Sequence, residues 1–339
     1  MQAFDSTPRE RTGRVFQFAL FITSVAWVLA AQGLAARAAS GISMAFDMGA
    51  ERYLLSALFF VFLLWVGFSL LQAISLGSAT AREVLGLPRR ATSRREWAVG
   101  AAIGWGAVAV AVLPMALAGA LHVRFWTGFR SYELAIINLL TLAAAALAEE
   151  VAFRGFPFRR LIEAIGPVKA TIVMAFLFGA MHLLNPDATW ISTLITMLAG
   201  VLLSIAWLRT RGLWLPWGLH FGWNASMGVL FGLPVSGLVT FSTVVQTRAI
   251  GREWLTGGDY GPEAALLTGV VLVVAMAVLV RATRDYAWHY TYEAPVPGGY
   301  PMEAKPPAVH AAMEEQARPG GLVQILPAPS GPPPTDETK

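Results

Sequence analysis

Long runs of hydrophobic residues separated by short charged loops dominate this chain. Eight of these runs are each close to the roughly 20 residues that a membrane-spanning helix needs. They lie near Val15–Ala36, Tyr53–Leu76, Trp97–Ala120, Leu134–Phe156, Ala170–Leu184, Trp190–Leu208, Leu213–Leu233 and Pro262–Val280. The pattern predicts an all-α fold, a polytopic membrane helix bundle of about eight transmembrane helices.

The two ends of the chain differ from this helical region, which we expect to span residues 15–284. Residues 1–14 are polar and include three arginines, which predicts a short cytoplasmic tail. Residues 285–339 are rich in proline and contain few aliphatic side chains, so we expect a disordered cytoplasmic tail. The first hydrophobic run is long enough to remain in the membrane, and we therefore expect no cleaved signal peptide.

The loop charges indicate an orientation, because Lys and Arg are enriched in cytoplasmic loops. With the amino terminus inside, the inner loops hold most of the basic residues: Arg82, Arg89, Arg90, Arg94, Arg95, Arg159, Arg160, Lys169, Arg209, Arg211, Arg281 and Arg284. The outer loops then hold Arg37, Arg52, Arg124, Arg130, Arg248 and Arg252. This asymmetry favours eight spans with both termini cytoplasmic, and the compact layout suggests a bacterial cytoplasmic (inner) membrane.

Composition supports the membrane interpretation and narrows the chemistry. Of 339 residues, 56% are hydrophobic and 14% are charged, whereas soluble domains have about 25% charged residues. The net charge of +4 arises from loop residues that set orientation, so we expect no nucleic-acid partner. The chain has no cysteine, which excludes disulfides, thiolate zinc sites and a cysteine nucleophile.

Two carboxylates and a guanidinium interrupt the fourth hydrophobic run. A charge at mid-membrane costs roughly 2.5 to 3.5 kcal/mol on insertion scales, so such residues indicate function. In a helix, Glu150 and Arg154 are four residues apart with the acid first, which favours a side-chain pair. Glu149 lies about 100° around the helix and lacks this partner. We expect Glu150 to be a paired structural anion and Glu149 a general base. The alternative is that both carboxylates reach the inner surface near the helix end.

Two later runs carry histidines. His182 lies late in the fifth run, where a single histidine is either a packing residue or a catalyst. In the seventh run His220 and Asn224 are four residues apart, so that both polar side chains point to the same place. Small residues near both histidines permit close helix approach or leave room for a substrate backbone; they are Gly179, Ala180, Gly218, Gly222, Ala225 and Gly228.

Depth in the membrane separates these residues unless the helix boundaries shift. With symmetrical spans, Glu149 lies near the inner surface and His182 near the outer one, about 20 Å apart at 1.5 Å per residue. We therefore expect the fourth helix to continue through Phe158 and the fifth to enter near Thr171. The site would then be an intramembrane cavity reached from one side. The long loop from Pro234 to Gly261 either shapes access to this cavity or is a plain surface turn.

Together these residues form three ordered motifs, EExxxR, FxxxH and HxxxN, each in a hydrophobic run. They stand here as Glu149 to Arg154, Phe178 to His182, and His220 to Asn224. The set resembles the CPBP family of intramembrane proteases, which includes the type II CAAX prenyl endopeptidases (Ras-converting enzyme). The resemblance covers roughly Leu134–Leu233, and the rest of the chain is similar in general character alone.

The resemblance implies that the chain is an endopeptidase that hydrolyses a peptide bond in the membrane with a glutamate-activated water. It assigns roles to six residues: Glu149 with His182 activates the water, His220 with Asn224 stabilises the oxyanion, and Glu150 with Arg154 braces the site. General-base and oxyanion chemistry both suit these residue types.

Metal dependence is open at this point. Glu149, His182 and His220 are an adequate ligand set for Zn²⁺ with an open position. The chain has no HExxH pair, and the three side chains come from different segments. We favour a mechanism without a cofactor.

Other functions remain possible from the residues alone. Buried Glu and His residues also relay protons in transporters, although no inverted repeat is visible here. A non-catalytic scaffold or a bacteriocin-immunity factor is a further alternative, because fold does not fix function. For an enzyme, the expected substrate is a membrane-associated peptide or lipidated protein, cleaved next to the membrane lipid. No residue identifies it as prenylated.

Overall fold

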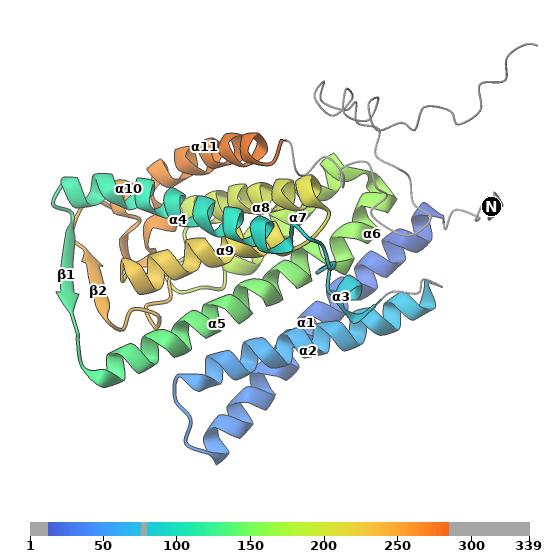
Figure 1. The fold of residues 1–339 in the computed structure, drawn as a ribbon, viewed down its shortest axis with the longest axis horizontal. Helices are drawn as coiled ribbons and strands as arrows, with labels where there is room; N and C mark the ends of the chain where they lie inside the picture. Colours follow the sequence, from blue (N-terminus) through green and yellow to red (C-terminus); the bar gives the residue numbers. More distant parts are fainter. Residues whose placement is uncertain (1–12, 76–79, 285–339) are drawn as a thin grey trace, which may run out of the picture. The chain divides into compact units, whose positions relative to one another are not determined.

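The computed structural model describes residues 13–75 and 80–284. Each of the eight predicted runs corresponds to a helix in it, which confirms the all-α bundle (Figure 1). These helices are α1 (Arg14–Ala45), α2 (Glu51–Ile74), α4 (Ser93–Leu117), α5 (Phe129–Arg154), α7 (Pro167–His182), α8 (Trp190–Thr210), α9 (Trp214–Ala225) and α11 (Leu266–Ala282). Residues 1–12 of the predicted amino-terminal tail (1–14) and the whole predicted carboxy-terminal tail (285–339) lie outside the described residues, and Arg14 is already the first residue of α1.

Short elements connect the eight helices. They are the helices α3 (Ala81–Val84), α6 (Phe156–Ile165) and α10 (Glu253–Thr256), the π-helix η1 (Ser226–Leu230), and the 3₁₀ turns η2 (Gly258–Tyr260) and η3 (Pro262–Ala264). In the packing, α1 lies against α2 and α6, α7 against α8, and α4 against α9. The helix α5 contacts α2 on one side and α9 on another, and therefore joins the α1–α2 pair to the rest of the bundle.

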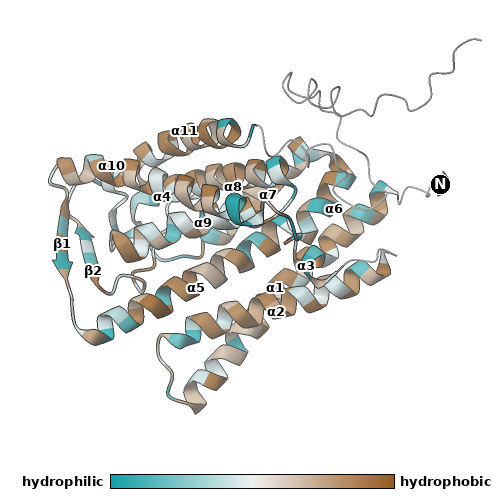
Figure 2. Cartoon of the chain, viewed as in Figure 1, coloured by the Kyte–Doolittle hydropathy of each residue, from teal (hydrophilic) through white to brown (hydrophobic). Residues whose placement is uncertain are grey.

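The helices have the composition of membrane spans. Five described stretches are long and apolar enough to cross a bilayer: α1, α2, α4, residues 129–165 and α8. The helices α7 and α11 are apolar but shorter, and α9 is mostly buried. Large hydrophobic side chains remain exposed on the outer helices, including Leu70, Leu117, Ile136, Ile172 and Val270. Figure 2 shows hydrophobic residues along most of the helix lengths. The chain is an integral multi-pass membrane protein.

The fourth run is broken, which corrects the expectation of one helix through Phe158. The helix α5 ends at Arg154, and Gly155 has φ −80° and ψ −127°, outside the helical region. The physical reason lies in Pro157, which inside a continuous helix would clash with the carbonyl of residue 153. In the first turn of the new helix α6 the same proline is tolerated. The next helix, α7, begins at Pro167, earlier than the expected Thr171.

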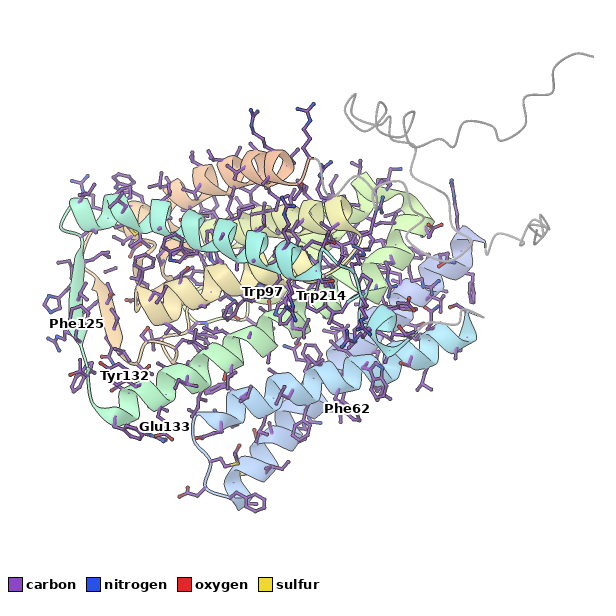
Figure 3. The ribbon with its side chains drawn as sticks, viewed as in Figure 1. Phe62, Trp97, Phe125, Tyr132, Glu133 and Trp214 are labelled. Carbon is purple, nitrogen blue, oxygen red and sulfur yellow. The ribbon has the colours of Figure 1, made fainter. Side chains whose placement is uncertain are left out.

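A two-stranded sheet, which the hydrophobic pattern does not predict, lies at one end of the bundle. Strand β1 (Leu121–Phe125) pairs antiparallel with β2 (Val245–Ala249), and Leu121 faces Ala249 in the register. We call this the sheet end. Exposed aromatic side chains gather there, namely Phe125, Trp126, Phe129 and Tyr132; Figure 3 labels Phe125 and Tyr132 beside β1 and the start of α5. Aromatic side chains of this kind are enriched at membrane–water interfaces.

Glycines on both partners bring α4 and α9 into close contact. A Cβ atom on Gly104 would lie 2.2 Å from the carbonyl oxygen of Leu219, and one on Gly222 would lie 2.3 Å from that of Ala101. Gly100 and Gly218 make the same kind of contact one turn away. Small residues at this spacing let two membrane helices approach closely. Of the two roles considered for Gly218 and Gly222, the structure shows close helix approach. This packing fixes the position of α9, the helix that carries His220.

Candidate active site

The two adjacent glutamates of α5 have different environments, as their spacing predicts. Glu150 is fully buried, and its Oε1 lies 3.2 Å from Nη1 of Arg154, also fully buried. The Glu149 side chain retains 36% of its exposure and lines a cavity. The paired carboxylate and the accessible one are therefore separated by one residue step on the same helix, as the geometry of a helix requires.

Arg154 has further partners that hold its charge in the bundle interior. Its Nη2 donates to the carbonyl oxygen of Gly200 on α8, at 3.1 Å. The guanidinium carbon lies 4.4 Å from the ring centroid of Phe178 on α7, in a cation–π arrangement. One buried arginine thus joins α5, α7 and α8, on the same helix as the half-buried Glu149.

His220 contacts both glutamates, a link that the sequence motifs do not reveal. Its Nδ1 lies 2.8 Å from Oε1 of Glu150, and its Nε2 lies 3.8 Å from Oε2 of Glu149. A carboxylate can only accept, so Nδ1 carries the proton and donates to Glu150. This bond fixes the orientation of the ring and directs Nε2 toward Glu149, as a carboxylate does for the imidazole of a catalytic triad.

His182 and Asn224 lie in the same cavity as Glu149 and His220. Nδ1 of His182 is 2.7 Å from the carbonyl oxygen of Phe178, and since a carbonyl only accepts, this nitrogen is the donor. Among the described residues, neither His182 nor Asn224 hydrogen-bonds Glu149 directly. The structure therefore gathers all four predicted catalytic residues around one space but places His220, rather than His182, in contact with the glutamate.

The cavity has a volume of about 310 Å³ and one polar end. Its polar end is formed by the four residues just named, together with Asn185 and Ser236. The remaining wall is mainly apolar and comes from α1, α2, α5, α7 and the loop after η1; it includes Val28, Phe60, Phe153, Met174 and Leu177, with Gln32 of α1 as its one polar side chain among the residues that the structure describes. This arrangement suits a ligand with one polar and one hydrocarbon part.

Sequence reasoning missed three polar residues near the site. Asn185 follows α7, Ser236 lies in the loop after η1, and Glu263 lies in η3. A signal for Glu263 was present, since it is a carboxylate at the start of the last hydrophobic run. The Ser226 hydroxyl donates to the backbone oxygens of Gly222 and Trp223, and Ser226 does not line the cavity.

The three side chains considered as zinc ligands, Glu149, His182 and His220, are not grouped as a metal site in the structure. In the described part of the chain, no cluster of three or more His, Asp or Glu residues is arranged to hold a metal ion. The zinc alternative requires Glu149, His182 and His220 to converge on one point, and these residues do not do so here. The mechanism proposed below is the one without a metal, and its test includes a chelator and zinc.

The fold and the site define a class: a multi-pass membrane protein with a buried carboxylate–histidine site that opens into a largely apolar cavity. Residues 130–226 match the family model of the type II CAAX prenyl endopeptidase Rce1-like proteins. This match contains all three motifs and confirms the resemblance to the CAAX-type intramembrane proteases. No curated protein and no solved structure matches the chain.

Proposed function

We propose that this protein is an intramembrane endopeptidase that hydrolyses a peptide bond with a water activated by Glu149. One observation carries the proposal: Glu149 is open to the cavity while its neighbour Glu150 is buried and orients His220 at 2.8 Å. A general base has to reach its substrate and needs a partner whose orientation is fixed. This pair of carboxylates provides both conditions.

The proposed reaction begins with Glu149, assisted by His182, taking a proton from water. The resulting hydroxide attacks the carbonyl carbon of the peptide, and the negative charge moves to the carbonyl oxygen. Asn224 donates a hydrogen bond to that oxyanion, as preorganised donors do in other acyl-transfer sites. His220 also donates to it through Nε2, and it does so as an imidazolium, because its Nδ1–H is already donated to Glu150. Glu149 then returns the proton to the leaving nitrogen, and the C–N bond breaks. His220 lies close enough to Glu149 to stabilise its charged form between these steps.

The cavity supports a lipidated peptide as the substrate. Its polar end holds the proposed catalytic side chains, and its apolar wall is contributed by four helices and the loop after η1. A hydrocarbon chain attached near the cleaved bond would gain about 0.8 kcal/mol per CH₂ that leaves water, although much of this gain is absent for a lipid already in the bilayer. We propose that the wall positions the lipid and that the polar end cuts the adjoining peptide.

The test is cleavage of a panel of quenched fluorescent peptides, prenylated and unprenylated, by detergent-purified protein. Glu149→Gln should lower kcat by at least about 100-fold, because it removes the general base. Glu133→Gln is the matched control, since Glu133 lies on the same helix and is exposed. Turnover that persists with a chelator supports the metal-free route; turnover lost with the chelator and restored by zinc overturns it. Activity that survives Glu149→Gln refutes the proposed role of Glu149.

We also propose that the protein lies in a bacterial inner membrane with both termini cytoplasmic. The concentration of arginines in the predicted inner loops supports this orientation. A reporter that is active only in the cytoplasm, fused after Arg284, should be active. A reporter active only outside the cytoplasm should be active after insertion between Arg124 and Phe129. The reverse result would overturn the orientation.

A further inference from the structure

The segment of residues 234–242, here called the wall segment, separates two spaces. On one side Val235, Ser236, Leu238 and Phe241 line the active-site cavity. On the other side the same segment lines a groove of about 930 Å³ at the sheet end, next to β1 and β2. Because Val235 and Phe241 are buried in the hydrophobic core, this segment is a fixed part of the site.

Glu263 anchors the wall segment to α9. Its Oε2 accepts from the Ser236 hydroxyl at 2.8 Å and also from the Ser236 backbone N–H. Its Oε1 accepts from Nε1 of Trp223 at 3.0 Å. Trp223 is the residue directly before Asn224, so one carboxylate connects the wall of the cavity to the proposed oxyanion donor.

The backbone at the anchor point is strained. Ser236 has φ +49°, a left-handed conformation that costs a residue with a Cβ about 1 to 2 kcal/mol. Gly237 follows with φ +83°, and a Cβ there would lie 2.2 Å from the carbonyl oxygen of Pro186. The bonds to Glu263 offset this strain, as does a bond of 3.1 Å from Asn185 to the carbonyl oxygen of Ser236. Without the carboxylate, Ser236 would lose its two hydrogen bonds to Glu263 and keep the one from Asn185.

Glu263 also faces a second, smaller space behind the active site. This space of about 40 Å³ is lined by Glu263 and Ser236 together with His182, His220 and Asn224. It is large enough for at least one water molecule. The carbonyl oxygen of Tyr260 accepts from the Gly237 N–H at 2.9 Å, a second link between the wall segment and the loop that carries Glu263. Residues from these two loops thus meet three of the proposed catalytic side chains around this space.

We propose that Glu263 is a positioning residue that fixes the wall segment and Asn224 relative to each other, and so sets which peptide bond lies over Glu149. The inference rests on the proposed hydrolysis. Glu263 acts through Ser236 and Trp223 and does not touch the reacting atoms. Residue 263 lies beyond the matched family segment, 130–226.

The test compares Glu263→Gln with Glu253→Gln, an exposed carboxylate of the same loop region. A glutamine keeps the shape of the side chain but has an NH₂ group in place of one carboxylate oxygen. That group faces either Trp223 Nε1–H or the Ser236 N–H, which are themselves donors, so at least one hydrogen bond is lost. We expect KM for the peptide to rise about fivefold or more with kcat within about threefold, and mass spectrometry to show cleavage at neighbouring bonds. Glu253→Gln should match the wild type in both measurements. If Glu263 were purely structural, Glu263→Gln would lower the melting temperature and leave KM and the cleavage position unchanged. That result would overturn the proposal.

Hydrogen–deuterium exchange separates this proposal from the proposed function. Amides in residues 232–242 should exchange at least about tenfold faster in Glu263→Ala, which removes both acceptor oxygens, than in the wild type or in Glu253→Ala, because the anchoring bonds limit local opening. This readout does not require turnover. If the wild type cleaves no peptide, the proposed hydrolysis fails while faster exchange still supports the anchor. Unchanged exchange overturns the anchor whether or not the protein is active.

Discussion

Two buried arginines, six residues apart, have different roles in this bundle. Arg154 ends α5 and bonds a carboxylate, Glu150, together with a backbone oxygen of α8. Arg160 lies in α6 and donates to the side-chain oxygens of Gln17, Gln72 and Ser75, at 3.2, 2.7 and 3.0 Å. Each guanidinium also lies over a phenylalanine ring, at 4.4 Å for Arg154 and 4.5 Å for Arg160.

The difference lies in what each arginine holds. Arg154 holds a carboxylate that in turn orients His220 beside Glu149. Arg160 connects α6 to α1 and α2 through neutral amides and a hydroxyl. A buried charge in a membrane protein is therefore a guide to a site when its partner is itself ionisable and bonds a side chain that lines a cavity, as Glu150 bonds His220. Where the hydrogen bonds go to neutral groups on neighbouring helices, the same residue type stabilises the packing.

The largest effect is expected for Arg154→Met. Removing one partner of a buried ion pair leaves Glu150 uncompensated and costs about 3 to 5 kcal/mol. Glu150 should then hold His220 less firmly, and kcat should fall by at least about 100-fold. Thermal unfolding in detergent and peptide cleavage measure the two effects.

The control for this variant is Arg130→Met on the same helix. Arg130 pairs with Glu133 at 2.8 Å but is mostly exposed, and exposed pairs contribute about 0 to 1 kcal/mol. Equal losses of stability in the two variants would contradict the assignment of Arg154 to the site.

A smaller effect is expected for Glu150→Gln. Both donors, Nη1 of Arg154 and Nδ1 of His220, bond the same oxygen, Oε1. A glutamine with its oxygen at that position keeps both bonds and removes the charge. We expect kcat to fall by about 10- to 100-fold, because the imidazolium loses its stabilising anion. Full activity would show that orientation of His220 is sufficient and that the charge is dispensable.

Arg160→Met should separate stability from catalysis. The variant loses hydrogen bonds from a charged donor, each worth about 1.5 to 3 kcal/mol, but it also removes the cost of burying that charge, so we expect a net loss of about 1 to 3 kcal/mol. The kcat of the folded protein should stay within about threefold of the wild type, because no partner of Arg160 lines the catalytic cavity. A loss of activity comparable to that of Arg154→Met would remove the distinction between the two arginines.

The sequence predicts the ion pair of Arg154 better than it predicts the contacts of Arg160. The Glu150–Arg154 pair follows from spacing alone, because both residues lie on one helix. The bonds from His220 to Glu150 and from Arg160 to Gln17 depend on how separate helices approach, and local periodicity contains no such information. The break at Gly155 had a local signal in Pro157, whereas the pairing of β1 with β2 joins segments more than 100 residues apart in the chain.

The sequence indicates which of the candidate side chains share a cavity better than it indicates their contacts. Glu149, His182, His220 and Asn224 line one cavity, and the motifs place each of them on a hydrophobic helix. The motifs pair Glu149 with His182, yet the nearer imidazole belongs to His220. That outcome depends on the glycine contact between α4 and α9, which sets the position of α9 and is a property of two helices together.

The smallest effect is expected for Ser75→Ala. Ser75 is one of three acceptors for Arg160, and its hydroxyl also donates to the Gln72 carbonyl oxygen at 2.8 Å. Because Nη2 of Arg160 keeps its bond of 2.7 Å to Gln72, no donor is left without a partner, and the loss should be about 0.5 to 1.5 kcal/mol with unchanged kcat. Combining Ser75→Ala with Arg160→Met tests the contact directly. If the hydroxyl acts through Arg160, the serine substitution should cost less in the Arg160→Met background than in the wild type, whereas additive losses would show that Ser75 stabilises the end of α2 independently.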